Sequence, residues 1–501
     1  MNVEWLTADE MARRMAAGEA SARSLTDRCL DRIERLDRRG PGLHAMLEIN
    51  PDARSIADRL DEERDGGSVR GPLHGVPVVI KGNIDTSDGM TTTAGSLALA
   101  GHIAEDDAFL VRRLRAAGLV LLGKANLSEW ANFRGRGSLS GWSSLGGQTR
   151  NPHVLDRSPC GSSSGSAVAV AAGYGPLSVG TETDGSIVCP AHMNGVVGLK
   201  PTVGLVSRSG IIPIAASQDT AGPMARSVRD VAALLEALCE EDPGDSATAV
   251  PREHRARDYT AALGPEGLQG ARIGVARGLV TGKPPLSEVL EDAVATIRRL
   301  GATVIDPVPM EIPSELRKSE YEVLLYEFKD GVNAYLRRLP PESAVHSLAD
   351  VIAFNEAHRD RVMPFFGQEA MIESEAKGSL DDDAYREALT TCRRLARTEG
   401  LDATLRMHEL DALVSLTGGP AWLIDVVHGD YAIAGCSTLA AVAGTPHITV
   451  PAGRIGDLPI GLSFFGPAFS EPLLLRLAHA FELGSAPWRP PRFLPSFAAR
   501  P

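Results

Sequence analysis

Serine hydroxyls are concentrated in two short segments, GSSSG at 161–165 and TDGS at 183–186. No charged side chain occurs from Ser158 to Thr181, although 23% of all residues are charged. Glycine permits the backbone dihedrals of tight anion-binding turns, and small side chains let the backbone approach a ligand closely. The two segments therefore predict a reaction centre built on serine hydroxyls.

Lys81 is a candidate base because it ends the apolar run VPVVI at 76–80 in a chain where lysine is scarce. Burial would lower the pKa of this amine from its usual value of about 10.4, and a neutral amine can act as a general base. These residue types allow a catalytic pair in which a lysine amine activates a serine hydroxyl. A lysine that simply emerges at the end of a strand is the commoner case.

Two other motifs formally match different chemistry. The GSSSG segment fits the G-x-S-x-G nucleophile elbow with Ser163 as nucleophile, but the residues before it make a poor strand. An elbow also needs a histidine, and no local context marks His428 or His447. Ser374 and Lys377 have the S-x-x-K spacing of β-lactamases, but we expect this acidic helical stretch to present them on a solvated face.

Net charge argues against two classes of partner. The chain has 51 Lys+Arg against 64 Asp+Glu, a net charge of −13, which disfavours nucleic acid or an anionic membrane as the main partner. The N-terminal residues lack the apolar stretch of a signal peptide, and no segment offers the roughly 20 apolar residues that span a bilayer. We expect a soluble, cytoplasmic protein.

The six cysteines are scattered, with no C-x-x-C spacing, at positions 29, 160, 189, 239, 392 and 436. This distribution predicts reduced thiols rather than a disulfide framework or a zinc site.

The elements that would position the serines and the lysine alternate between strand and helix patterns. A strand at 76–81, a helix at 108–117 and a strand at 119–122 predict a β–α–β unit. A second unit has strands at 273–275 and 303–305 around a helix at 287–300. We also expect helices before residue 70, at 227–240 and from 470, and short buried segments at 196–201, 211–214, 410–417, 447–450 and 459–465. These elements predict an α/β fold, a single large domain whose mixed central sheet is covered by helices on both faces.

Five segments divide this predicted domain. They are an N-terminal helical segment at 1–70, a central core at 71–240, a linker with the second β–α–β unit at 241–309, a helical insertion at 310–405 and the C-terminal part of the core at 406–501. We expect the loops at 135–150 and the insertion to line a substrate channel.

Three segments resemble the amidase signature family, in the family's order: GVPVVIK at 75–81, the Gly/Ser-rich stretch at 160–172 and GTETDGSI at 180–187. Further similarity occurs at 127–135, 147–152, 195–207 and 324–329, so it covers nearly the whole chain. The likeness is closest to the bacterial peptide amidases. It implies the amidase signature fold and hydrolysis of linear amides.

The resemblance also implies roles for matching residues. Ser186 matches the family's nucleophile, Ser162 the serine that follows a cis peptide bond, and Lys81 the base. The implied oxyanion hole consists of the backbone N–H groups of Thr183, Asp184, Gly185 and Ser186. Ser163 and Asn83 are expected to support the site.

The implied mechanism is a proton relay. Neutral Lys81 takes a proton from Ser162, which takes one from Ser186 as that oxygen attacks the amide carbonyl. The relay returns a proton to the leaving amine or ammonia, and water then hydrolyses the acyl-enzyme. No histidine, metal or cofactor is required.

Two departures from the family pattern affect the expected substrate preference. Gly82 stands where many members have Asp, and SLTG at 415–418, with Leu416, replaces an APTT-like segment. The expected activity is release of ammonia from C-terminal peptide or amino-acid amides. The alternatives are an aryl or aliphatic amidase or esterase, the amidase subunit of a tRNA-dependent amidotransferase, and a non-catalytic binding protein.

Overall fold

One mixed β-sheet runs through the computed structural model, which describes residues 3–256, 258–431, 435–485 and 488–497. Within these residues the sheet has 11 strands in the order β1-β3-β2-β6-β8-β7-β12-β13-β11-β9-β10. Their bounds are β1 Met46–Ile49, β2 Pro77–Lys81, β3 Val120–Ala125, β6 Leu177–Glu182, β7 Val197–Lys200, β8 Thr220–Ala225, β9 Arg272–Val275, β10 Thr303–Ile305, β11 Ala412–Leu416, β12 His447–Ile455 and β13 Leu458–Phe465. A separate hairpin joins β4 (Trp142–Ser143) to β5 (Gly147–Gln148).

The α-helices of the described residues are α1 Ala8–Ala16, α2 Ala22–Ile33, α3 Ala53–Asp65, α4 Phe109–Ala116, α5 Ser164–Ala171, α6 Val188–Asn194, α7 Val228–Leu238, α8 Leu286–Arg299, α9 Ser314–Leu336, α10 Leu348–Ala357, α11 Arg359–Val362, α12 Glu369–Glu375, α13 Asp383–Cys392, α14 Asp402–Met407, α15 Thr438–Val442 and α16 Glu471–Gly484. A π-helix, Arg393–Leu401, joins α13 to α14.

Parallel strand pairs occur where the sequence predicts β–α–β units. β2 is parallel to β3 across α4, and β9 is parallel to β10 across α8. A crossover helix is the usual connection between parallel neighbours, and both predicted units are confirmed. β2 is also parallel to β6, and this pair carries the lysine and the approach to the second serine segment.

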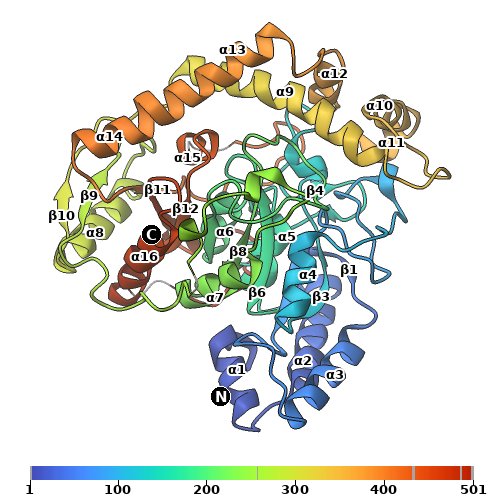
Figure 1. Cartoon of the computed structure of the whole chain (residues 1–501), viewed down its shortest axis with the longest axis horizontal. Helices are drawn as coiled ribbons and strands as arrows, with labels where there is room; N and C mark the ends of the chain where they lie inside the picture. Colours follow the sequence, from blue (N-terminus) through green and yellow to red (C-terminus); the bar gives the residue numbers. More distant parts are fainter. Residues whose placement is uncertain (1–2, 257, 432–434, 486–487, 498–501) are drawn as a thin grey trace.

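Helices cover both faces of the sheet, as expected (Figure 1). Val78 and Ile80 of β2 lie in the same core cluster as Leu235 of α7, whereas Val79 packs with Val168 of α5. Successive side chains of a strand point to opposite faces, so α5 and α7 lie on opposite sides of β2. The fold is a single α/β domain with a large mixed sheet.

The expected strand–helix pattern needs two corrections. Residues 46–49, expected to be helical, form β1, which pairs antiparallel with β3. The expected segment at 211–214 is buried at Ile212 and Ile214, and Ile211 forms a bridge with Ile84. The expectation also omitted β8, because its sequence TAGPMA contains glycine and proline, which are depleted in strands.

Segment 310–405 is largely helical, and Figure 1 shows α9 to α14 as a yellow-to-orange arc opposite the N-terminal helices. The five-segment division itself stays a prediction. Phe328 of α9 packs with Trp130 and Phe133 in a second hydrophobic cluster. The expectation that Ser374 lies on a solvated face is wrong, because α12 packs against α9 and buries this serine completely.

A buried ion pair lies within the loop at 128–134, and its arginine also reaches the helical arc. The Arg134 guanidinium donates to Glu129 Oε1 at 2.8 Å, and both side chains are fully buried. Arg134 also donates to the carbonyls of Val362 and Phe366. Between the two charges, Trp130 and Ala131 both have a φ of 53°, in the left-handed region that non-glycine residues avoid. The ion pair therefore closes a strained loop, and the bonds from Arg134 to the Val362 and Phe366 carbonyls hold this loop against the arc.

We expect Arg134→Met to lower the free energy of unfolding by about 3–5 kcal/mol, because it leaves Glu129 as an uncompensated buried charge. Denaturant titration at neutral pH measures this change. Arg136→Met is the matched control, since that side chain is 72% exposed and forms a surface ion pair with Glu373. Its loss should stay within about 1 kcal/mol. Equal losses in the two variants would contradict the structural role of the buried pair.

Candidate active site

Lys81, the predicted base, lies at the end of β2 and is completely buried. Its Nζ donates to Ser162 Oγ at 2.8 Å, to Thr181 Oγ1 at 2.8 Å and to the Thr181 carbonyl at 3.1 Å. None of the ion pairs in the described residues involves Lys81. β2 and β6 run in parallel, so the register that aligns Ile80 with Val179 brings Lys81 to Thr181.

Burial lowers the pKa of Lys81 from its usual 10.5 to about 7. The negative charges of Asp219 and Glu182 oppose this effect without forming an ion pair. At neutral pH a large fraction of the amine is therefore unprotonated, which is the state that can accept a proton.

Asn83 supports the lysine through Thr181, since its Nδ2 donates to Thr181 Oγ1 at 3.1 Å. Gly82 leaves room for its neighbours: a Cβ there would lie 2.7 Å from Leu47 Cδ1 and 3.0 Å from the Ala125 carbonyl. A side chain at position 82 would therefore require these neighbours to shift.

Ser162, the predicted relay, is fully buried, and the peptide bond between Gly161 and Ser162 is cis, as the resemblance implied. The Ser128 N–H donates to the Ser162 carbonyl at 3.1 Å. A Cβ at Gly161 would collide with Ser128 Oγ, so this turn requires glycine.

Ser186, the predicted nucleophile, follows β6 in the loop that leads to α6, and it is 8% exposed. Its carbonyl accepts the Ser163 N–H at 3.1 Å, which joins the two serine segments. No hydrogen bond joins the hydroxyls of Ser162 and Ser186 within the described part of the chain. Catalytic hydrogen bonds are often long before substrate binds.

The carboxylate of Glu182 organises the loop around Ser186. It accepts the N–H groups of Gly185 at 2.9 Å, Ile187 at 2.7 Å and Val188 at 3.0 Å. The Gly185 N–H is thus already engaged. The N–H groups of Thr183, Asp184 and Ser186 have no acceptor among the described residues.

Other polar groups fix Thr183 in the same loop. Its hydroxyl donates to Asp219 Oδ1 at 2.5 Å, and its carbonyl accepts from Gln218 Nε2 at 3.3 Å. Asp219 also accepts the N–H groups of Ile214 and Ala215. Burial raises the pKa of Asp219 to about 6. The sequence reasoning missed Asp219 and Gln218, because a lone Gln-Asp pair in a loop carries no recognisable spacing.

A disulfide joins Cys160 to Cys189, which corrects the prediction of six reduced thiols. Cys29, Cys239 and Cys392 carry free thiols, as does Cys436. The bond connects the turn before Ser162 to α6, which follows Ser186. A sequence separation of 29 residues gives no sign of this proximity; it arises because α5 and α6 pack side by side.

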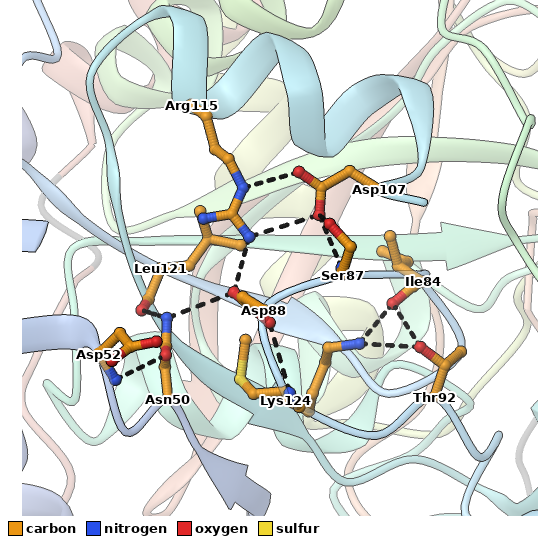
Figure 2. Close-up of polar contacts among 11 residues, drawn as sticks. Asn50, Asp52, Ile84, Ser87, Asp88, Thr92, Asp107, Arg115, Leu121 and Lys124 are labelled. Atoms are coloured by element: carbon orange, nitrogen blue, oxygen red, sulfur yellow. Dashed lines mark hydrogen bonds and ion pairs between the residues drawn. The ribbon is translucent and has the colours of Figure 1, made fainter. Parts of the chain in front are cut away.

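Two further buried lysines lie near the sheet, but their partners differ from those of Lys81. Figure 2 shows Lys124 Nζ donating to the Ile84 carbonyl at 2.6 Å and to Thr92 Oγ1 at 3.0 Å. Close by, Arg115 bridges Asp107 and Asp88, which ties the turn after β2 to α4 (Figure 2).

Burial lowers the pKa of Lys124 to about 8, and it also lowers that of Lys200 to about 8. Lys200 Nζ donates to the Pro201 carbonyl. Of the three buried lysines, Lys81 alone donates to a serine hydroxyl in the described structure, so the partner distinguishes it better than burial does.

The alternative motifs do not form reactive sets. Ser163 is buried at the start of α5, with no strand before it, and its hydroxyl donates to the Thr181 carbonyl at 3.0 Å. His428 is exposed and pairs with Asp425, whereas His447 is buried beside Ser463. Neither histidine contacts a serine of the two segments.

Two kinds of feature are missing from the described residues. They contain no group of three or more His, Cys, Asp or Glu side chains arranged to hold a metal ion. None of their helices is both long and apolar enough to cross a membrane.

A cavity of about 550 Å³ lies beside the site. Asn83, Thr181 and Thr183 line it, together with Tyr335 of α9 and the segment 211–214. That the insertion lines a substrate channel stays a prediction. No residue of 135–150 lines this cavity, and Ser162 and Ser186 do not line it either.

The structure is thus an α/β protein in which a buried amine of pKa about 7 contacts one serine hydroxyl, and a second serine lies in a loop with N–H groups that have no acceptor among the described residues. The sequence profile of the family described as Amidase matches residues 24–475. The chain belongs to this amidase family, and it is a hydrolase that acts on amide carbon–nitrogen bonds.

Three similar proteins illustrate the range of the family. The crystal structure of peptide amidase from Stenotrophomonas maltophilia superposes with a TM-score of 0.93 at 52% identity, covering 97% of this chain and 98% of that one. A probable amidase of Arabidopsis thaliana is 42% identical over 472 residues, 92% of this chain and 87% of the relative. A glutamyl-tRNA(Gln) amidotransferase subunit of Symbiobacterium thermophilum is 37% identical over 491 residues, 95% of this chain and 96% of the relative.

We expect reduction of the Cys160–Cys189 disulfide to destabilise the protein by about 3–4 kcal/mol, because the bond closes a loop of intermediate length. Thermal and denaturant unfolding with and without a phosphine reductant measure the loss. The double variant Cys160→Ala/Cys189→Ala should be similarly destabilised and should no longer respond to the reductant. A variant as stable as the oxidised protein would show that the bond contributes nothing.

Proposed function

We propose that this hydrolase releases ammonia from the C-terminal amides of peptides or amino acids. The contact between Lys81 and Ser162 carries the proposal, because it joins a buried amine of pKa about 7 to a serine hydroxyl at 2.8 Å. The 52% identity with an enzyme named peptide amidase supports the substrate class.

In the proposed reaction, Ser186 attacks the amide carbonyl and forms an acyl-enzyme. Ser162 takes the proton from the Ser186 hydroxyl and passes its own proton to neutral Lys81. The protonated relay then gives a proton to the departing nitrogen, which leaves as ammonia. A water molecule attacks the acyl-enzyme by the same route in reverse and restores Ser186.

The developing oxyanion would be stabilised by backbone N–H groups of the loop. Those of Thr183, Asp184 and Ser186 are unengaged among the described residues, whereas that of Gly185 is held by Glu182. Gly185 would contribute only by sharing its N–H between the carboxylate and the oxyanion. Such donors are each worth about 10²–10³ in rate.

A role within an amidotransferase is the second candidate, because a relative of that name is 37% identical over nearly the whole chain. Hydrolysis of aryl or aliphatic amides, or of esters, is a third candidate within the same fold. Ammonia release by the purified protein alone, from a panel of peptide amides and simple aryl amides, separates them. Activity that emerges only with a partner protein would favour the amidotransferase, and turnover of none would remove the enzymatic proposal.

A cytoplasmic location stays part of the proposal. The disulfide weighs against it, because disulfides are rare in proteins of the reducing cytosol.

Ser186→Ala should lower kcat by roughly four orders of magnitude or more, since the nucleophile is gone while binding groups remain. Steady-state ammonia release measures kcat, and thermal unfolding checks that the variant is folded. Ser162→Ala should also be strongly impaired. Substantial turnover by folded Ser186→Ala would mean that another group attacks the amide.

The activity should depend on pH through Lys81. The neutral amine is the active form, so Lys81 should make kcat/KM fall about tenfold per unit below its folded pKa of about 7, and its titration causes no loss above that pH. The pKa is lower in the folded state than the usual 10.5, so the unfolded chain binds more protons and this group makes stability rise with pH between about 7 and 10.5. A pH–rate profile tests the first statement. A profile that stays flat from pH 5 to pH 8 would exclude Lys81 as the base.

A further inference from the structure

Two carboxyl groups meet where α9 passes the loop before Ser186. Glu320 lies on α9 and is 8% exposed. Its carboxyl group lies close enough to that of Asp184, two residues before the proposed nucleophile, for the Asp184 charge to raise the pKa of Glu320. Glu320 Oε1 also accepts from Gln218 Nε2 at 3.1 Å, and the same amide reaches the Thr183 carbonyl. Glu320 thus reaches the loop both beside Asp184 and through Gln218.

The hydrogen bonds of Asp184 are incomplete. Its Oδ2 accepts from Thr438 Oγ1 at 2.7 Å, but its Oδ1 is buried and no donor in the described residues reaches it. Neither Asp184 nor Glu320 takes part in an ion pair within that part of the chain. Two neighbouring ionised carboxylates repel each other, and a buried acceptor without a donor is unfavourable. A single proton shared by the pair removes both problems.

The surroundings of Glu320 favour placing this proton on Glu320. Burial raises its pKa well above the usual 4.5, and the neighbouring Asp184 charge raises it further. The groups that face it are Asp184 and Gln218 from the core, Arg317 one turn earlier on α9, and Cys392 on α13. The positive charge of Arg317 acts in the opposite direction and lowers the pKa of Glu320. The Cys392 thiol, with a pKa raised to about 12, is neutral and adds no charge.

We propose that Glu320 is a positioning residue whose protonated carboxyl donates a hydrogen bond to Oδ1 of Asp184 and thereby holds the loop from Thr183 to Ser186 in its reactive geometry. This inference rests on the proposed function of that loop. Ionisation of Glu320 would remove the donor and place a second negative charge beside the N–H groups that would bind the oxyanion. The loss of kcat at alkaline pH would then belong to Glu320, whereas the loss at acidic pH belongs to Lys81.

The shared proton also affects stability. The folded protein binds this proton more tightly than the unfolded chain, so stability falls as pH rises from about 4.5 towards the raised pKa of Glu320. This effect has the opposite sign to that of Lys81 and does not require turnover.

The test compares Glu320→Gln with Glu320→Leu in the full-length protein. Glutamine can donate to Asp184 Oδ1 and accept from Gln218, but it cannot ionise. Leucine fills similar space and does neither. Glu315→Gln is the matched control, because its side chain is on the same helix and 63% exposed.

Glu320→Gln should keep kcat near the native value at neutral pH and should retain it at alkaline pH, where native kcat falls. Glu320→Leu should lose about tenfold in kcat throughout, with a smaller change in KM, because Asp184 Oδ1 is left without a donor and the Gln218 amide loses one of its two acceptors. Glu315→Gln should match the native enzyme.

Thermal unfolding across the pH range is the second readout. The native protein should lose stability with rising pH relative to Glu320→Gln. Equal kcat for the Gln and Leu variants, together with parallel unfolding profiles, would overturn the proposal. A native protein that hydrolyses no amide would refute the proposed function instead, and the unfolding comparison would still decide whether the pair shares a proton.

Discussion

The site depends on one constraint: the amine of Lys81 is buried without a carboxylate partner among the described residues. An ion pair would raise its pKa and keep it protonated, so it could not accept a proton. Here Lys81 donates to Ser162 and to Thr181, and burial brings its pKa to about 7. The carboxylates of Asp219 and Glu182 lie close enough to moderate this shift, but they bond to backbone and hydroxyl groups of the loop. The acidic groups therefore shape the site without neutralising its base.

Elements distant in sequence fix the backbone around the two serines. Glu182 gathers three N–H groups, Asp219 holds Thr183, and Glu320 reaches the same loop from α9. The Cys160–Cys189 disulfide ties the turn before Ser162 to the helix after Ser186. Oxyanion stabilisation requires donors that are already oriented before the reaction. On the proposed function, the helical arc therefore helps to hold the loop that carries Ser186, although it lies far from the central strands in sequence.

Sequence reasoning identified most of the fold because long apolar runs and capped helices have local signals. It failed for β1 and β8, whose pairing is decided by neighbouring strands rather than by their own pattern. For the site, apolar surroundings marked Lys81, but Lys124 and Lys200 are equally buried. Lys81 differs from these two lysines only in its hydrogen-bond partners, Thr181 of β6 and Ser162 of the 161–165 turn. Family resemblance supplied that choice, as it did the choice of Ser162 over Ser163.

The groups that resemblance did not supply share a physical feature: each acts between segments remote in sequence. Cys160 and Cys189, like Glu320 and Asp184, become neighbours only after the helices pack. Lys81 and Glu320 need opposite protonation states. Lys81 must lose its proton to act, and Glu320 must keep its own to hold the loop. Both shifts are caused mainly by burial, which disfavours the charged form of either group. The packing that excludes water from the serines thus sets both limits of the pH range in which the site would work.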